Sequence, residues 1–112
     1  MTYHLVDATD IDAGPGPHPA ASPYDKRVSE ALRLENFEVY QVELPPGAET
    51  VRHDHADDRV EDMYAVVRGS GWVVVGGEEV AVGPGQFVAV SLESARFVRA
   101  GEEGLTLIAV CA

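Results

Sequence analysis

From residue 37 onward, apolar and polar residues alternate in short runs that glycine and proline interrupt. Side chains on a β-strand point to its two faces in turn, so this period of two predicts half-buried strands. Turn signals recur about every eight to twelve residues, which is typical of a β-sandwich or barrel. The expected strands are residues 37–44, 50–55, 62–68, 72–75, 79–82, 87–91, 96–100 and 105–111.

The first third of the chain has a different pattern. Residues 12–23 hold four of the seven prolines, and proline is excluded from helix interiors and central strands, so this stretch is expected to be an extended arm. After it, Val28, Ala31 and Leu32 recur at helical spacing and predict one short helix. We therefore expect a single domain, with the arm and helix in residues 1–34 and a barrel in residues 35–112.

Length and charge narrow the possible functions. A chain of 112 residues, 46% of them hydrophobic, suits one domain with one modest core. Nineteen acidic residues against eight basic ones give a net charge of -11, which should repel nucleic acid and anionic membranes. No apolar run is long enough to span a bilayer and no secretory signal begins the chain, so a cytoplasmic location is expected.

One pair of histidines carries the clearest chemical signal. His53 and His55 are two residues apart, so on a strand they share a face and both imidazoles can converge on one metal ion. A carboxylate follows at Glu61 or Asp62, and neighbours on a strand point to opposite faces, so only one of them can join the histidines. The acidic loop between His55 and these carboxylates, residues 56–59, is expected to be solvated.

The surroundings of this pair resemble the cupin family. The stretch from Gly47 to Gly69 is similar to the first cupin motif, with a glycine, five residues, His-x-His, a gap, a carboxylate, six residues and a glycine. The turn Gly83–Gln86 resembles the start of the second motif, with glutamine where the family usually has aspartate. The resemblance covers roughly residues 37–110 and implies an all-β jelly-roll barrel, a double-stranded β-helix.

The resemblance also implies a metal site. His53, His55 and the carboxylate would hold a divalent ion such as Zn, Ni, Mn or Fe. The gap before the carboxylate is longer than is usual in the family. Counting back from Gly69 favours Asp62 as the ligand, whereas the loop length favours Glu61.

The second motif departs from the family at its histidine. Arg96 stands at that position, eleven residues after the last glycine of the turn, and arginine stays protonated and cannot bind a metal. In one outcome, Arg96 points away from the metal ion and anchors a substrate carboxylate. In the other, it pairs with Asp62 or Glu61 and occupies the place of the metal ion. Tyr64 would share the face of Asp62 and is a second candidate for contacting a bound anion. The sequence thus leaves open a metal-dependent enzyme on a small acidic or carbonyl compound and a metal-free small-molecule-binding or regulatory module.

A homodimer is the expected assembly. A short chain buries a limited core and leaves strand edges open, and the arm of residues 12–23 could cover an edge of a second copy. The cupin resemblance points the same way, because small cupins often pair.

Overall fold

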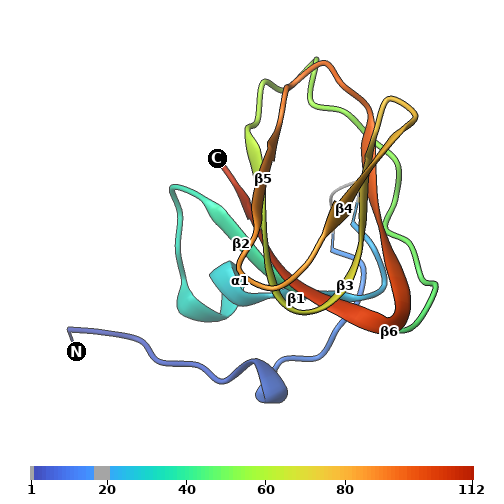
Figure 1. Ribbon diagram of the computed structural model, residues 1–112. Helices are drawn as coiled ribbons and strands as arrows, with labels where there is room; N and C mark the ends of the chain where they lie inside the picture. Colours follow the sequence, from blue (N-terminus) through green and yellow to red (C-terminus); the bar gives the residue numbers. More distant parts are fainter. Residues whose placement is uncertain (1, 17–20) are drawn as a thin grey trace.

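The computed structural model describes residues 2–16 and 21–112 and confirms the all-β prediction. Its strands are β1 (Asp25–Arg27), β2 (Glu38–Leu44), β3 (Asp62–Val75), β4 (Glu78–Val82), β5 (Phe87–Val90) and β6 (Arg96–Cys111). All pairings are antiparallel, in the order β1-β2-β6-β3-β4, and β5 pairs with β3. Figure 1 shows the strands curving around a common interior, as in a jelly-roll barrel.

The two longest strands, β3 and β6, each unite two strands that the sequence predicted as separate. The expected turn at residues 69–71 is instead a bend inside β3, with register shifts against β6 on either side of Gly69. A Cβ at Gly69 would collide with the carbonyl oxygen of Gly104, and one at Gly71 with that of Arg99. These glycines therefore allow two strands to approach closely, rather than ending them.

Residues 50–55 do not form the predicted regular strand. They run beside β6 and are joined to it through isolated contacts, one of them a bridge between His53 and Arg96. The Thr50 amide donates to the carbonyl of Val98, and the His53 amide donates to that of Arg96. Between these two hydrogen bonds the segment advances by three residues, whereas β6 advances by two. The extra residue is a bulge, which interrupts the ladder and changes the direction of the side chains that follow.

The predicted short helix is present as α1 (Val28–Leu32). Strand β1, just before it, was not predicted; it pairs with β2, so the sheet begins before residue 35. A 3-10 turn, η1 (Ala8–Asp10), lies in the N-terminal segment.

The N-terminal arm contacts its own chain. The Gly14 amide donates to the Asp25 carbonyl at 3.0 Å, and Lys26 Nζ donates to the Ala8 carbonyl at 2.9 Å. Figure 1 shows this segment, in blue, passing along one end of the barrel. Residues 17–20, in the middle of the arm predicted for residues 12–23, lie outside the described residues.

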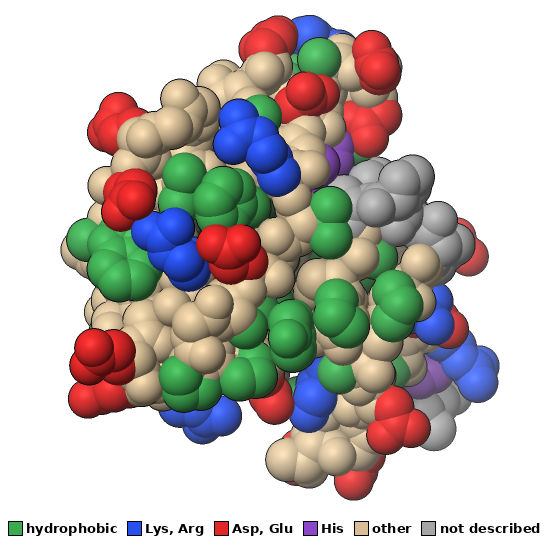
Figure 2. All heavy atoms as spheres, turned by 90° about the vertical axis from the view of Figure 1, so that its right-hand side faces the viewer, with side chains coloured by type: hydrophobic (Ala, Val, Ile, Leu, Met, Phe, Trp, Pro, Cys, Tyr) green, Lys and Arg blue, Asp and Glu red, His purple; other side chains and the backbone are tan. Residues whose placement is uncertain are grey.

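The core lies inside the barrel. Its buried hydrophobic members are Val42, Leu44, Tyr64, Val66, Val73, Val82, Val90, Val98, Ala100, Leu105, Leu107 and Ala109. In the described part of the chain, the side chains of His55, Asp62 and Arg96 are also buried, which is unusual for such polar groups unless they are paired. On the face shown in Figure 2, acidic side chains lie mostly around the outline, and hydrophobic patches lie between the charges.

None of the helices in the described part of the chain has the length and apolar character needed to cross a membrane.

Candidate metal centre and cavity

A cavity of about 320 Å³ opens into the barrel. Its inner wall is mostly apolar and comes from the central strands, with Tyr40, Val42, Tyr64, Leu107 and Ala109 among the residues that line it. Part of its lining comes from the N-terminal segment, from residue 21 to residue 38. A cavity of this size and composition suits one small organic molecule.

The start of β3 brings a carboxylate to this cavity. Asp62 is 4% exposed and pairs with Cys111 of β6 on one side and Val90 of β5 on the other. Glu61 is exposed, and its backbone forms hydrogen bonds with the backbone of Ala112. Of the two candidate carboxylates, Asp62 is therefore the one that lies beside the histidines, as the count from the following glycine favoured.

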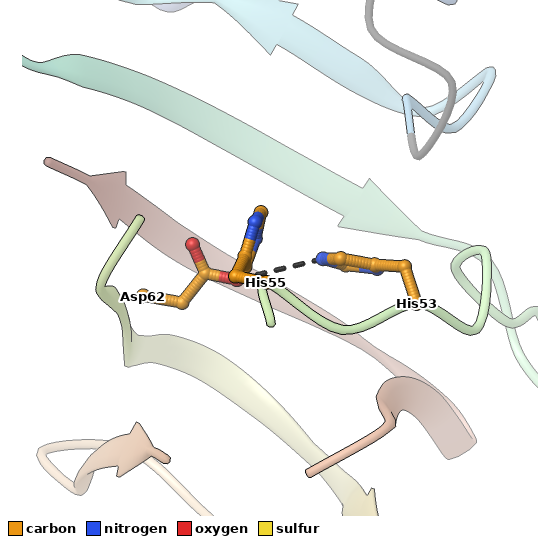
Figure 3. Close-up of side chains that lie close together, drawn as sticks. All are labelled: His53, His55 and Asp62. Carbon is orange, nitrogen blue, oxygen red and sulfur yellow. Dashed lines mark hydrogen bonds and ion pairs between the residues drawn. The ribbon is translucent and has the colours of Figure 1, made fainter. Parts of the chain in front are cut away.

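The two histidines converge on Asp62 (Figure 3). His55 Nε2 lies 2.9 Å from Asp62 Oδ2, and His53 Nε2 lies 3.5 Å from the same oxygen. The two imidazole rings stand nearly perpendicular, at 82°, with their centroids 4.9 Å apart. Nitrogen or oxygen atoms of all three side chains lie within 4.8 Å of one another, a spacing that could hold a metal ion.

Each imidazole is fixed from behind through its other nitrogen. His53 Nδ1 lies 2.9 Å from the carbonyl oxygen of Val51, and His55 Nδ1 lies 2.9 and 3.1 Å from the carboxylate oxygens of Asp58. Carbonyls and carboxylates only accept, so both Nδ1 atoms carry the proton and both Nε2 atoms face Asp62. Metal-binding histidines are commonly held in this way. Sequence reasoning missed Asp58, which it placed in a solvated loop; its position three residues after His55 was the available signal.

This arrangement demands positive charge between the three groups. Two unprotonated Nε2 atoms and a carboxylate oxygen repel one another unless a proton or a cation lies between them. The hydrogen bond to Asp62 raises the pKa of His53. Burial alone would raise the pKa of Asp62, but the hydrogen bonds with His53 and Cys111, and then the charges of His55 and Arg96, lower it to about 2. Asp62 is therefore ionised at neutral pH.

Arg96 supplies one of the positive charges. Its fully buried guanidinium donates from Nη1 to Asp62 Oδ2 at 2.8 Å, from Nη2 to the Ser91 carbonyl at 2.6 Å and from Nε to the Ser94 carbonyl at 3.0 Å. Of the two expected outcomes, the structure shows the pairing with Asp62. Arg96 is not among the residues that line the cavity, and its contact with a substrate carboxylate stays a prediction.

Two further side chains complete the inner end of the cavity. Tyr64 lines it, and its hydroxyl lies 3.4 Å from Asp62 Oδ2. Burial, and then the charge of Asp62, raises the pKa of Tyr64 and that of the Cys111 thiol, so both stay protonated. The other carboxylate oxygen, Asp62 Oδ1, is buried and accepts no hydrogen bond of ordinary geometry from the described residues.

A comparison with protein families matches residues 40–111 to the family described as the cupin domain. The match covers most of the barrel, and the chain belongs to this family. A comparison with curated proteins gave no match.

Solved structures share the fold. A cupin protein from Bacteroides fragilis matches with a TM-score of 0.76 and 18% identity, covering 100% of this chain and 85% of that one. A sugar phosphate isomerase of the cupin superfamily from Silicibacter pomeroyi matches with a TM-score of 0.80 and 21% identity, covering 97% and 75%. KdgF from Halomonas sp. matches with a TM-score of 0.60 and 23% identity, covering 67% and 66%. At these identities the likeness establishes the fold.

Proposed function

We propose that this cupin binds a divalent metal ion through His53, His55 and Asp62, and that the ion contacts a small molecule in the cavity. The orientation of the imidazoles carries the proposal, because acceptors hold both Nδ1 atoms and leave both Nε2 atoms facing Asp62. Asp62 Oδ1, buried without a partner among the described residues, is a further free acceptor for a cation. Two imidazoles and one carboxylate with open positions suit Zn, Ni, Mn or Fe.

A carbonyl or hydroxyl compound is the proposed ligand. A bound ion would act as a Lewis acid and polarise such an oxygen. The apolar walls would exclude water, and the protonated Tyr64 could donate a hydrogen bond to the ligand. The name of the Silicibacter neighbour, a sugar phosphate isomerase, is compatible with a carbonyl substrate. An acidic substrate loses support, because the guanidinium of Arg96 is already used by Asp62 and two backbone carbonyls.

One observation favours a second candidate, a metal-free binding or regulatory module. The ion pair between Arg96 and Asp62 already gives the carboxylate a full counter-charge. A second proton on His55 would then satisfy both carboxylates beside that ring, since Asp58 and Asp62 each lie 2.9 Å from one of its nitrogens. The cavity would bind its ligand without a metal ion.

Elemental analysis separates the two candidates. Purified protein is incubated with zinc, nickel or manganese and dialysed before the metal is measured. The metal-binding proposal predicts one ion per chain, lost in His53→Ala and kept in His4→Ala, which removes an exposed histidine outside the cavity lining. A metal content that is low, or equal in the two variants, would favour the metal-free module.

We also propose that the chain forms a homodimer. The described residues include exposed hydrophobic side chains on two paired strands, with Phe87 of β5 70% exposed and Val67 of β3 52% exposed. Burial of such a patch against a second copy is favourable. A monomer mass in sedimentation at micromolar protein concentration would refute the dimer.

A further inference from the structure

The loop of residues 56–61 connects His55 to Asp62, and its backbone turns back towards His55. The Arg59 amide donates to the His55 carbonyl at 2.9 Å. Arg59 has a φ of 60°, a left-handed conformation that costs free energy for a residue with a long side chain. Its guanidinium lies 3.2 Å from the carboxylate of Glu93, in the turn before β6. Together these contacts define the path of the loop.

This path brings the carboxylate of Asp58 behind the ring of His55. The two oxygens of Asp58 lie 2.9 and 3.1 Å from His55 Nδ1. The Val60 amide donates to Asp58 Oδ1 at 3.1 Å, so the carboxylate is itself held from within the loop. His55 is 4% exposed, and a buried ring has little room to turn. The contact between Asp58 and His55 is therefore fixed from both sides.

His55 thus lies between two carboxylates. Asp58 faces its Nδ1, and Asp62 Oδ2 lies 2.9 Å from its Nε2. A neutral imidazole carries one proton on one of its two nitrogens, and only the other nitrogen can bind a metal ion. The position of this proton therefore decides whether His55 can bind an ion that also contacts Asp62.

The two carboxylates differ as acceptors for this proton. Asp62 Oδ2 already accepts a charge-assisted hydrogen bond from Arg96 Nη1 at 2.8 Å, and the Tyr64 hydroxyl lies 3.4 Å from the same oxygen. An oxygen that faces a positive donor attracts a further proton less strongly. Asp58 offers both of its oxygens to His55 Nδ1. The proton of a neutral His55 is therefore more stable on Nδ1 than on Nε2.

We propose that Asp58 is a positioning residue, which holds the proton of His55 on Nδ1 and so keeps Nε2 free to bind a divalent metal ion. The inference rests on the proposed function in taking His55 as a metal ligand. Without Asp58, the proton would move to Nε2 and form a hydrogen bond with Asp62, which would block this nitrogen. Loss of a group that orients a metal-binding histidine typically weakens metal binding by about ten- to a hundredfold.

NMR signals of the imidazole nitrogens in metal-free protein test the position of the proton. Protein treated with EDTA is measured at about pH 8, where an ordinary histidine is neutral. We expect His55 of the wild type to carry its proton on Nδ1, and Asp58→Ala to move it to Nε2. Asp57→Ala is the matched control, because it removes an exposed carboxylate from the same loop and should leave the proton on Nδ1. A proton on Nε2 of His55 in the wild type would overturn the inference, even if Asp58→Ala failed to fold.

Calorimetric titration with zinc measures the effect of Asp58 on the metal site. Asp58→Ala should weaken zinc binding about tenfold or more, whereas Asp57→Ala should change it by less than about twofold. Equal zinc affinities of the two variants, with the wild type binding zinc, would also overturn the inference. Failure of the wild type to bind zinc counts against the metal site instead, because the nitrogen signals of metal-free protein report on Asp58 and His55 alone.

Discussion

Arg96 Nη1 lies 2.8 Å from Asp62 Oδ2, and the side chains of both residues are almost completely buried. Such a pair adds little to the free energy of unfolding when it is compared with two apolar residues in the same places. Removing one partner alone, however, leaves a buried charge without compensation. The pair explains how the barrel keeps an ionised carboxylate beside two histidines. It also makes Asp62 a structural residue as well as a proposed metal ligand.

The first prediction concerns this ion pair. Asp62→Ala should lower the free energy of unfolding by about 3 kcal/mol, because it leaves the guanidinium of Arg96 buried without a carboxylate. Urea unfolding of the EDTA-treated proteins measures the change. Asp57→Ala, in the exposed loop nearby, should cost less than about 0.5 kcal/mol. Similar losses in the two variants would mean that the ion pair does not stabilise the fold.

The second prediction restores the family histidine. Arg96 is bridged to His53 across two antiparallel segments, so side chains at these positions are cross-strand neighbours. Arg96→His should strengthen binding of a divalent metal about tenfold or more, equal to about 1.4 kcal/mol, by adding an imidazole and removing a positive charge. Arg99→His is the control, because Arg99 stacks on Trp72 outside the cavity lining. Calorimetric titration giving equal affinities for the wild type and Arg96→His would show that position 96 does not reach the metal.

The third prediction is a loss of stability in acid. The folded-state pKa of Asp62 is about 2, below its ordinary value of 3.8, so its contribution is present above pH 3.8 and is lost as the pH falls towards 2. The loss should be roughly 2 kcal/mol in metal-free protein. His53 has the opposite sign: its raised pKa contributes stability that is present below its ordinary pKa of 6.5 and is lost as the pH rises above that value. Urea unfolding at a series of pH values measures both losses of stability. If the Asp62→Asn variant lost as much stability in acid as the wild type, the loss could not be assigned to Asp62.

The fourth prediction concerns the bend in β3. Gly71→Ala should destabilise the protein by about 2 kcal/mol or more, because its Cβ would collide with the carbonyl oxygen of Arg99 in the paired strand. Gly83→Ala is the matched control, since a Cβ there meets no atom within 4 Å. Thermal unfolding of the two variants measures the difference. Equal melting temperatures would show that β3 and β6 can separate at this point without cost.

The alternating pattern predicted most of the strands because one face of each is buried. It placed β2 at residues 37–44, close to its bounds of Glu38–Leu44. It could not show that β3 continues through Gly69 and Gly71, because glycine marks both a turn and a close approach of two backbones. The short strand β1 lacked a clear apolar pattern, since its residues are Asp25, Lys26 and Arg27.

The site could be predicted as far as local spacing allows. His53, His55 and Asp62 followed from the motif and from the count to a glycine, and the structure brings all three together. The contacts of Arg96 with Asp62 and two carbonyls depend on the path of the loop before β6, so sequence alone left two outcomes open. The N-terminal segment and the barrel both contribute to the lining of the cavity, and such long-range contacts leave no signal in local spacing.

The most direct test of the metal-binding proposal is anomalous X-ray scattering from crystals of the zinc-loaded protein, recorded on both sides of the zinc absorption edge. The proposal predicts one strong peak per chain, about 2.0–2.2 Å from the Nε2 atoms of His53 and His55 and from a carboxylate oxygen of Asp62. A peak elsewhere, or none at this cluster while Arg96 keeps its bond to Asp62, would contradict it and favour the metal-free module.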